Sequence, residues 1–309
     1  MRRYRPAGVA CWRGMPTFAF ETVDVFTSQR FGGNPLAVFP DAAGLTDGDM
    51  QQLAAEFNLS ETTFVLPPSD PAHTARVRIF NRSHEMPFAG HPMVGTAFVL
   101  ASRRSDAPET FVFEVPAGLV RIRLTRDGGA VTGAEIDAPQ PLATGVTLAA
   151  ADVAASLGLT PDDVVTLAHP PIFATVGNTY VIAELTREAL VRATPDLAAF
   201  RRVLASTPGL GDRYSLYVYA RRDAASVEAR MFAPIVGTWE DPATGSAATP
   251  LAALLLSIAG GEALAVEIHQ GVTMGRPSLL RASASRADDG IRARVAGTCV
   301  PVFSGTARV

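Results

Sequence analysis

Two short glycine-containing turns carry the side chains best suited to acid–base chemistry. The first reads Ala89-Gly90-His91-Pro92, and the second reads Asp241-Pro242-Ala243-Thr244-Gly245-Ser246. Each turn opens an apolar helix, and the N–H groups at a helix start can bind a carboxylate or a developing oxyanion. His91, Asp241 and Ser246 flank these groups. The alternative interpretation is that the two glycines only permit close packing.

A third candidate is Glu61, in the segment Asn58-Leu59-Ser60-Glu61-Thr62-Thr63. It falls between the end of an amphipathic helix and a β-branched strand, where a side chain can project from a fixed backbone. Because Glu is rarely buried, this residue taken alone is typical of a solvated surface carboxylate. Nothing in its local sequence distinguishes it.

The helices that follow the two turns, residues 92–102 and 246–258, are apolar or small on every face. Such helices must be enclosed on all sides. We therefore expect an α+β fold in which a mainly antiparallel sheet curls around a central helix, twice over. A doubly wound fold is not favoured, because strands do not alternate regularly with long helices. The predicted strands are residues 62–66, 75–80, 110–115, 120–124, 214–220 and 227–232.

Three further helices are predicted between the strands. Residues 46–57 combine a Thr46–Asp49 capping pair with apolar residues at helical spacing. Residues 149–157 end before Gly158. Thr194-Pro195 predicts another helix start, with proline in the first helical position.

Weak self-similarity indicates that the chain contains two copies of one domain. The segments around Asn34 and Asn178 match at an offset of 144, Arg78 and Arg230 match at 152, and His91 and Thr244 match at 153. A Pro-rich connector at residues 138–141 predicts domains at 15–137 and 138–309. Residues 1–14 are expected to form a disordered extension, with Met15 as an alternative initiator. Pseudo-symmetry would place the two helix starts on either side of an interdomain cleft, where small ligands usually bind.

Composition excludes several classes of function. The 309 residues carry a formal net charge of −3, which gives no electrostatic basis for nucleic-acid binding, and no apolar run is long enough to span a membrane. All 27 basic residues are arginine, so a pyridoxal-phosphate lysine and a P-loop lysine are excluded. The two cysteines, Cys11 and Cys299, stand apart from any metal-binding pattern. The predictions are no metal, no cofactor and a cytoplasmic location.

Five motifs in order resemble the PhzF family of phenazine-biosynthesis-type isomerases, which share the diaminopimelate-epimerase-like fold. They are FGGNPLAV (31–38), NLSETTFV (58–65), PFAGHP (87–92), EDPATGSA (240–247) and QGVTMGRPS (270–278). The resemblance implies two pseudo-symmetric domains, with a last strand that returns to the N-terminal domain. It also implies a cofactor-free homodimer whose active site lies in the interdomain cleft.

The resemblance further implies an isomerase that moves a proton between carbons of a small cyclic carboxylic acid. In the family this acid is trans-2,3-dihydro-3-hydroxyanthranilate, and the corresponding substrate here is a small anionic organic acid. Glu61 would shuttle the proton, while His91, Asp241 and Ser246 would bind and polarise the substrate. His91 would act as a protonated or donating group, and Asp241 would orient His91 or bind a substrate ammonium or hydroxyl. The flanking residues expected to contact the substrate are Ser60, Gly90, Thr244 and Gly245.

Two other functional classes stay open at this point. One is an epimerase, racemase or lyase that acts on another small carboxylic or amino acid, and the other is a ligand-binding or protein-binding member of the fold without catalysis. Related racemases use a cysteine at each central-helix start, whereas here Ala89 and Pro242 stand at those positions, so racemisation by two thiols is not favoured. Met93, beside the presumed site, bears on substrate identity.

Overall fold

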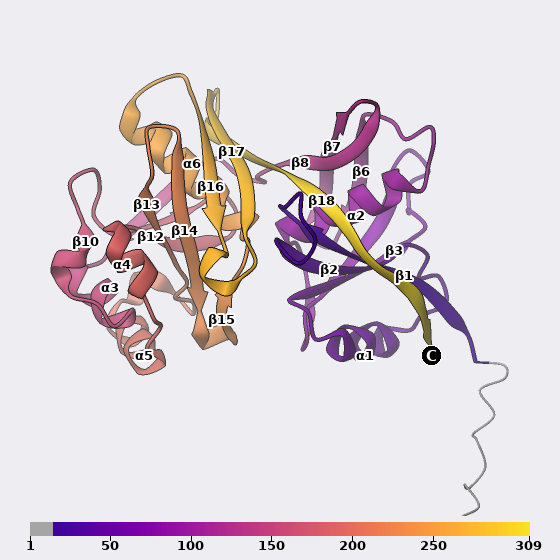
Figure 1. Ribbon diagram of the computed structural model, residues 1–309, viewed down its shortest axis with the longest axis horizontal. Coiled ribbons are helices and arrows are strands. Elements are labelled where there is room, and N and C mark those ends of the chain that lie inside the picture. The colour runs from indigo at the N-terminus through magenta and orange to yellow at the C-terminus, as the bar shows by residue number, and fades with distance from the viewer. Residues whose placement is uncertain (1–14) are drawn as a thin grey trace, which may run out of the picture.

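The computed structural model describes residues 15–309, so the predicted extension at residues 1–14 lies outside the described part. Figure 1 shows two lobes side by side, each with strands arranged around a helix. Among the described residues, no helix has both the length and the apolar character needed to cross a bilayer.

The first lobe is a sheet wrapped around α2. Its order is β1-β2-β3-β4-β6-β7-β8, with parallel pairing in β2–β3 and β4–β6 and antiparallel pairing elsewhere. The elements are β1 (Thr17–Val25), β2 (Asn34–Phe39), α1 (Asp47–Phe57), β3 (Glu61–Leu66), β4 (Ala75–Phe80), β5 (Glu85–Met86), α2 (Gly90–Ser102), β6 (Thr110–Val115), β7 (Gly118–Asp127) and β8 (Ala130–Asp137).

The second lobe repeats this pairing around α6. Here β12–β13 and β14–β16 are parallel, while β11–β12, β13–β14 and β16–β17 are antiparallel. The elements are β9 (Ala143–Thr147), α3 (Ala150–Ser156), η1 (Pro161–Asp163), β10 (Val164–Val165), β11 (Ile172–Thr175), β12 (Thr179–Leu185), α4 (Arg187–Arg192), α5 (Leu197–Ser206), η2 (Pro208–Leu210), β13 (Leu216–Arg221), β14 (Ser226–Ala233), η3 (Pro234–Val236), β15 (Thr238–Asp241), α6 (Gly245–Ala259), β16 (Ala263–Gln270), η4 (Val272–Met274) and β17 (Ser278–Ala287).

The last strand, β18 (Gly290–Arg308), joins the two lobes. Its first part pairs with β17, its middle pairs with β8, and its end pairs with β1. In Figure 1 this strand runs from the second lobe across to the first, where the C-terminus lies. Because β18 bridges β8 and β1, it closes the sheet of the first lobe around α2. The predicted division of the chain at residue 138 stays a prediction.

The predicted α+β fold, with an apolar helix at the centre of each curved sheet, is confirmed. In α2 every residue from Gly90 to Val99 is buried, and in α6 burial extends from Gly245 to Leu256 with only Ser246 partly exposed. Each fully buried large apolar side chain contributes about 1.5–3 kcal/mol. Enclosing both helices therefore stabilises the arrangement that brings their starting turns together.

Two predicted helix starts had different outcomes. Helix α1 begins as predicted, because the side chain of Thr46 accepts a hydrogen bond from Asp49 N and the Asp49 side chain accepts one from Thr46 N. The start predicted at Thr194-Pro195 is wrong, since α5 begins two residues later. Asp196 caps it instead, with Oδ1 accepting from the N–H groups of Ala198 and Ala199. A side-chain acceptor for two free N–H groups outweighs the preference of proline for the first helical position.

Candidate active site

The starts of α2 and α6 lie face to face between the lobes. A Cβ atom added to Gly90, the first residue of α2, would lie 3.5 Å from the backbone nitrogen of Ser246. It would lie 3.8 Å from the carbonyl carbon of Gly245, the first residue of α6. The N–H groups of both helix starts are therefore concentrated in one place, which favours a negatively charged ligand there.

Both central helices begin at a glycine, Gly90 in α2 and Gly245 in α6. Ala89, Pro242 and Thr244, the residues just before these starts, carry no thiol. The two-cysteine chemistry of racemases therefore lacks its groups at these positions.

Glu61 and His91 meet in a largely enclosed space beside the helix starts. Glu61 is the first residue of β3, fixed by parallel pairing with Leu36 of β2, and His91 is the second residue of α2. Glu61 Oε2 lies 3.3 Å from His91 Nε2, and the two side chains are 15% and 7% exposed. Within residues 15–309 neither atom has a hydrogen-bond partner of adequate geometry. Two buried polar atoms left in this state are available to a ligand.

Burial keeps both members of this pair uncharged near neutral pH. It raises the pKa of Glu61 to about 8, and the negative charge of Asp241 adds to that effect. Burial also lowers the pKa of His91 to about 3. The protonated His91 considered from sequence therefore does not fit this environment. A carboxyl group whose pKa lies near the working pH can both accept and return a proton.

Asp241, the last residue of β15, is buried and doubly hydrogen-bonded. Its Oδ1 accepts from Asn34 Nδ2 at 2.9 Å, and its Oδ2 accepts from Thr244 Oγ1 at 2.5 Å. Burial raises its pKa to about 6, although both hydrogen bonds oppose the rise. No hydrogen bond within residues 15–309 joins Asp241 to His91, so the predicted role of Asp241 in orienting His91 stays a prediction.

Tyr180 and Gln270 are further polar residues of the second lobe that bond to Ser246 or to the turn before it, and Tyr217 bonds to Gln270. Tyr180 Oη lies 2.7 Å from Ser246 Oγ. Burial raises the Tyr180 pKa to about 12, and the charges of Asp241 and Glu61 contribute, so this phenol keeps its proton. The side chain of Gln270 donates to Asp241 O and to Thr244 Oγ1, and it accepts from Thr244 N and Tyr217 Oη.

The structure therefore gathers the predicted residues into two adjoining groups. Glu61, His91, Ser60 and Asp241 form the acid–base group, while Gly90, Thr244, Gly245 and Ser246 form the helix starts. A cavity of about 20 Å³ borders Gly90, Gly245 and Ser246 and is large enough for about one water molecule. Glu61, His91 and Asp241 do not line it.

Sequence reasoning missed Tyr180, Gln270 and Asn34. Tyr180 follows Gly177-Asn178 in the internal repeat, and Gln270 opens the QGVTMGRPS motif, but neither pattern assigns a role to the side chain. No group of three or more His, Cys, Asp or Glu within residues 15–309 is arranged to hold a metal ion.

The fold consists of two curved sheets, each around a buried helix, and both helices start at one acid–base cluster. This is an epimerase-like isomerase fold. The family model for phenazine biosynthesis-like proteins matches residues 23–305. The chain therefore belongs to the PhzF family, and it is an isomerase of the PhzF type.

Individual relatives support this assignment. The chain is 39% identical to an uncharacterised isomerase of Mesorhizobium japonicum, over 94% of this chain and 99% of that protein. It is 37% identical to the trans-2,3-dihydro-3-hydroxyanthranilate isomerase of Pseudomonas chlororaphis, over 92% of this chain and 97% of that protein. A PhzF-family structure from Bacillus anthracis has the same fold, with a TM-score of 0.85 at 24% identity, covering 96% of this chain and 100% of that one.

Proposed function

We propose that this protein moves a proton between two carbons of a small cyclic carboxylic acid, with Glu61 as the single acid–base group. The substrate would be trans-2,3-dihydro-3-hydroxyanthranilate or a close analogue. The observation that carries the proposal is the unpartnered Glu61 Oε2, 3.3 Å from His91 Nε2 in an enclosed space. The identity of 37% to an enzyme named for this substrate supports the same conclusion.

In the first step, the Glu61 carboxylate would remove a proton from a ring carbon, and the C–H electron pair would enter the conjugated system of the substrate. A pKa of about 8 leaves about one Glu61 in ten ionised at pH 7. In the second step, the same carboxylic acid would return the proton to a different carbon. No atom or electron is gained overall, so the reaction is an isomerisation.

The negative charge that develops on the substrate needs stabilisation, because acid–base catalysis typically supplies only about 10²–10⁴-fold. The N–H groups at the starts of α2 and α6 and the Ser246 hydroxyl are placed to supply it. Neutral His91 would contact the substrate through Nε2. Ser60, Gly90, Thr244 and Gly245 would line the binding site around these groups.

The test is incorporation of solvent deuterium into carbon. Purified protein would be incubated with trans-2,3-dihydro-3-hydroxyanthranilate in D₂O, and exchange would be followed by NMR. Glu61→Gln should abolish exchange while ligand affinity stays within about tenfold, since the amide keeps the shape of the acid but cannot transfer the proton. Glu56→Gln, on the exposed surface of α1, is the matched control and should exchange at the wild-type rate.

Each contrary result has a definite meaning. Wild-type exchange in Glu61→Gln would show that Glu61 is not the base. Exchange only with a different cyclic or amino acid would indicate an isomerase or epimerase with another substrate. Binding without exchange for every acid would indicate a non-catalytic member of the fold.

Homodimer formation, independence of cofactors and a cytoplasmic location stay predictions. Sedimentation analysis tests homodimer formation.

A further inference from the structure

The side chain of Asn34 connects the two lobes at the acid–base cluster. Asn34 is the first residue of β2 and is only 1% exposed. Its Nδ2 donates to Asp241 Oδ1 and to Ala243 O, both at 2.9 Å. Its Oδ1 accepts from Ser60 Oγ at 3.0 Å. The Asn34 amide thus joins Ser60, the residue before Glu61, to the Asp241 carboxylate and to the turn before α6.

Hydrogen-bond requirements fix the direction of every bond in this group. The carbonyl of Ala243 can only accept, so the nitrogen of the Asn34 amide must face it. The amide oxygen is then left for the hydroxyl of Ser60, which must donate. Thr244 Oγ1 accepts from Gln270 Nε2 and keeps its own proton for Asp241 Oδ2. Both oxygens of Asp241 therefore accept, an arrangement that favours its ionised form.

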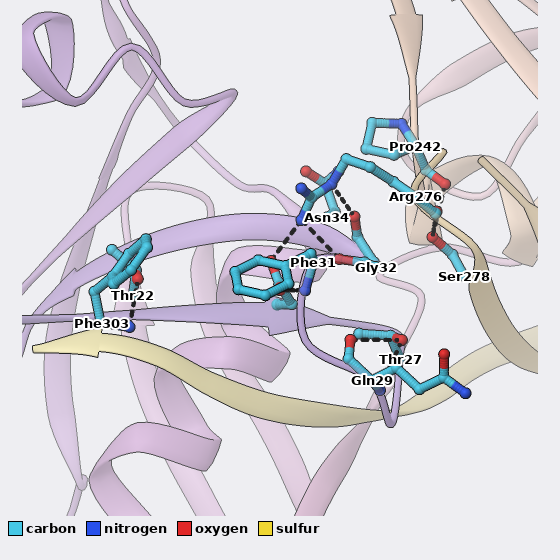
Figure 2. A network of polar contacts seen from close by, with 12 residues as sticks. Thr22, Thr27, Gln29, Phe31, Gly32, Asn34, Pro242, Arg276, Ser278 and Phe303 are labelled. Atoms are coloured by element: carbon cyan, nitrogen blue, oxygen red, sulfur yellow. Dashed lines mark hydrogen bonds and ion pairs between the residues drawn. The ribbon is translucent and has the colours of Figure 1, made fainter. Parts of the chain in front are cut away.

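The backbone on both sides of this bridge is held in place. The guanidinium of Arg276 donates to Gly32 O, to Gly33 O and to Asp24 Oδ1 at 2.5–2.8 Å, as Figure 2 partly shows. Gly33 has φ +61°, and a Cβ there would lie 2.4 Å from Val25 O, so only glycine fits. In the second lobe, Ser278 Oγ donates to Pro242 O, next to Asp241 (Figure 2). Asn34 therefore spans a gap of fixed width.

We propose that Asn34 is a positioning residue for proton transfer: it holds Ser60 and Asp241 at a fixed separation across the lobes and keeps Asp241 ionised beside Glu61. The inference rests on the proposed role of Glu61, which is the group that Asn34 controls. It acts on Glu61 by two routes. One is its hydrogen bond with the hydroxyl of the adjacent Ser60, and the other is the charge of Asp241, which raises the Glu61 pKa.

The first experiment is a titration of the ligand-free protein, which does not depend on the choice of substrate. Side-chain ¹³C labelling of Glu, with Glu61→Gln to assign the signal, reports the midpoint of Glu61 ionisation. In Asn34→Ala, Asp241 loses a donor and becomes less ionised near pH 7. The Glu61 midpoint should fall by about 0.5 pH unit or more.

Asn34→Asp is the matched isosteric variant. Two facing carboxyl groups would share one proton and keep one negative charge near Glu61, so the Glu61 midpoint should stay close to the wild-type value. If Asn34 acted through packing alone, the Glu61 midpoint would be the same in the two variants. Asn81→Ala, in the turn after β4, removes a side chain whose hydrogen bonds go to Ser83 and His84, and it should leave the midpoint unchanged.

The second experiment measures turnover. Both Asn34 variants should lower kcat about tenfold or more. Alanine removes every bond of the bridge, and aspartate removes the amide donor to Ala243 O. The two lobes then shift slightly, and a small misplacement of reacting groups is costly. A folded Asn34→Ala with the wild-type midpoint, or Asn34→Asp with the wild-type kcat, would overturn the inference. If Asn34→Ala does not fold, the turnover of the isosteric Asn34→Asp decides the question. If the wild type shows no turnover but the predicted midpoint shift occurs, the proposed function fails while the control of Glu61 by Asn34 stands.

Discussion

Replacing Glu61 by glutamine should stabilise the protein increasingly as the pH rises. In the unfolded chain this carboxyl ionises near its ordinary value of 4.5, whereas burial and Asp241 raise its pKa in the folded protein to about 8. Between these values the unfolded state binds fewer protons than the folded state, so the free energy of unfolding decreases with rising pH. Relative to its value at a pH well below 4.5, the free energy of unfolding of the wild type should be lower by about 1 kcal/mol at pH 5, about 3 at pH 7 and about 5 at pH 9.

Glutamine does not titrate, so the difference in unfolding free energy between Glu61→Gln and wild type should follow this curve. Urea unfolding at pH 4, 5, 7 and 9 measures it, and Glu56→Gln on the exposed face of α1 serves as the control. Since the Glu61 side chain is 15% exposed, the values given are upper limits. A difference that does not change with pH, or one that falls as pH rises, would refute the burial of an acid at this position.

Three other substitutions test the surroundings of the site. Arg276→Ala leaves the 4% exposed Asp24 side chain without its cation and should lower the unfolding free energy by about 3–5 kcal/mol; a loss below about 1 kcal/mol by urea unfolding would contradict this. Gly90→Ala places a methyl group 3.5 Å from Ser246 N, an ordinary contact, so stability should change by less than about 1 kcal/mol while turnover falls about tenfold. Wild-type turnover in that variant would show that the helix starts do not bind substrate. Tyr180→Phe removes the hydroxyl 2.7 Å from Ser246 Oγ and should reduce kcat about tenfold with an unchanged pH profile; equal kcat would remove Tyr180 from the site.

Local sequence was sufficient for features that depend on neighbouring residues. The Thr46–Asp49 capping box fixes the start of α1, because its two hydrogen bonds form within one turn. The apolar character of α2 and α6 on every face predicted two enclosed helices, since such a surface is stable only when covered. The error at Thr194-Pro195 is also local: Asp196 offers the stronger cap.

Only the tertiary structure decided the chemical state of the site. The local sequence around Glu61 is typical of a surface carboxylate. In the folded protein, however, burial and the charge of Asp241 from the other lobe raise the pKa of Glu61 to about 8. Asn34, Tyr180 and Gln270 make their hydrogen bonds at the site with partners far away in the sequence. Hydrophobic patterning acts over a few residues and is readable from the chain itself, whereas solvent exclusion and electrostatic fields sum over everything nearby in space. That is why the sequence alone determined the two central helices and their glycine starts, while folding determined the raised pKa values of the two acids between them.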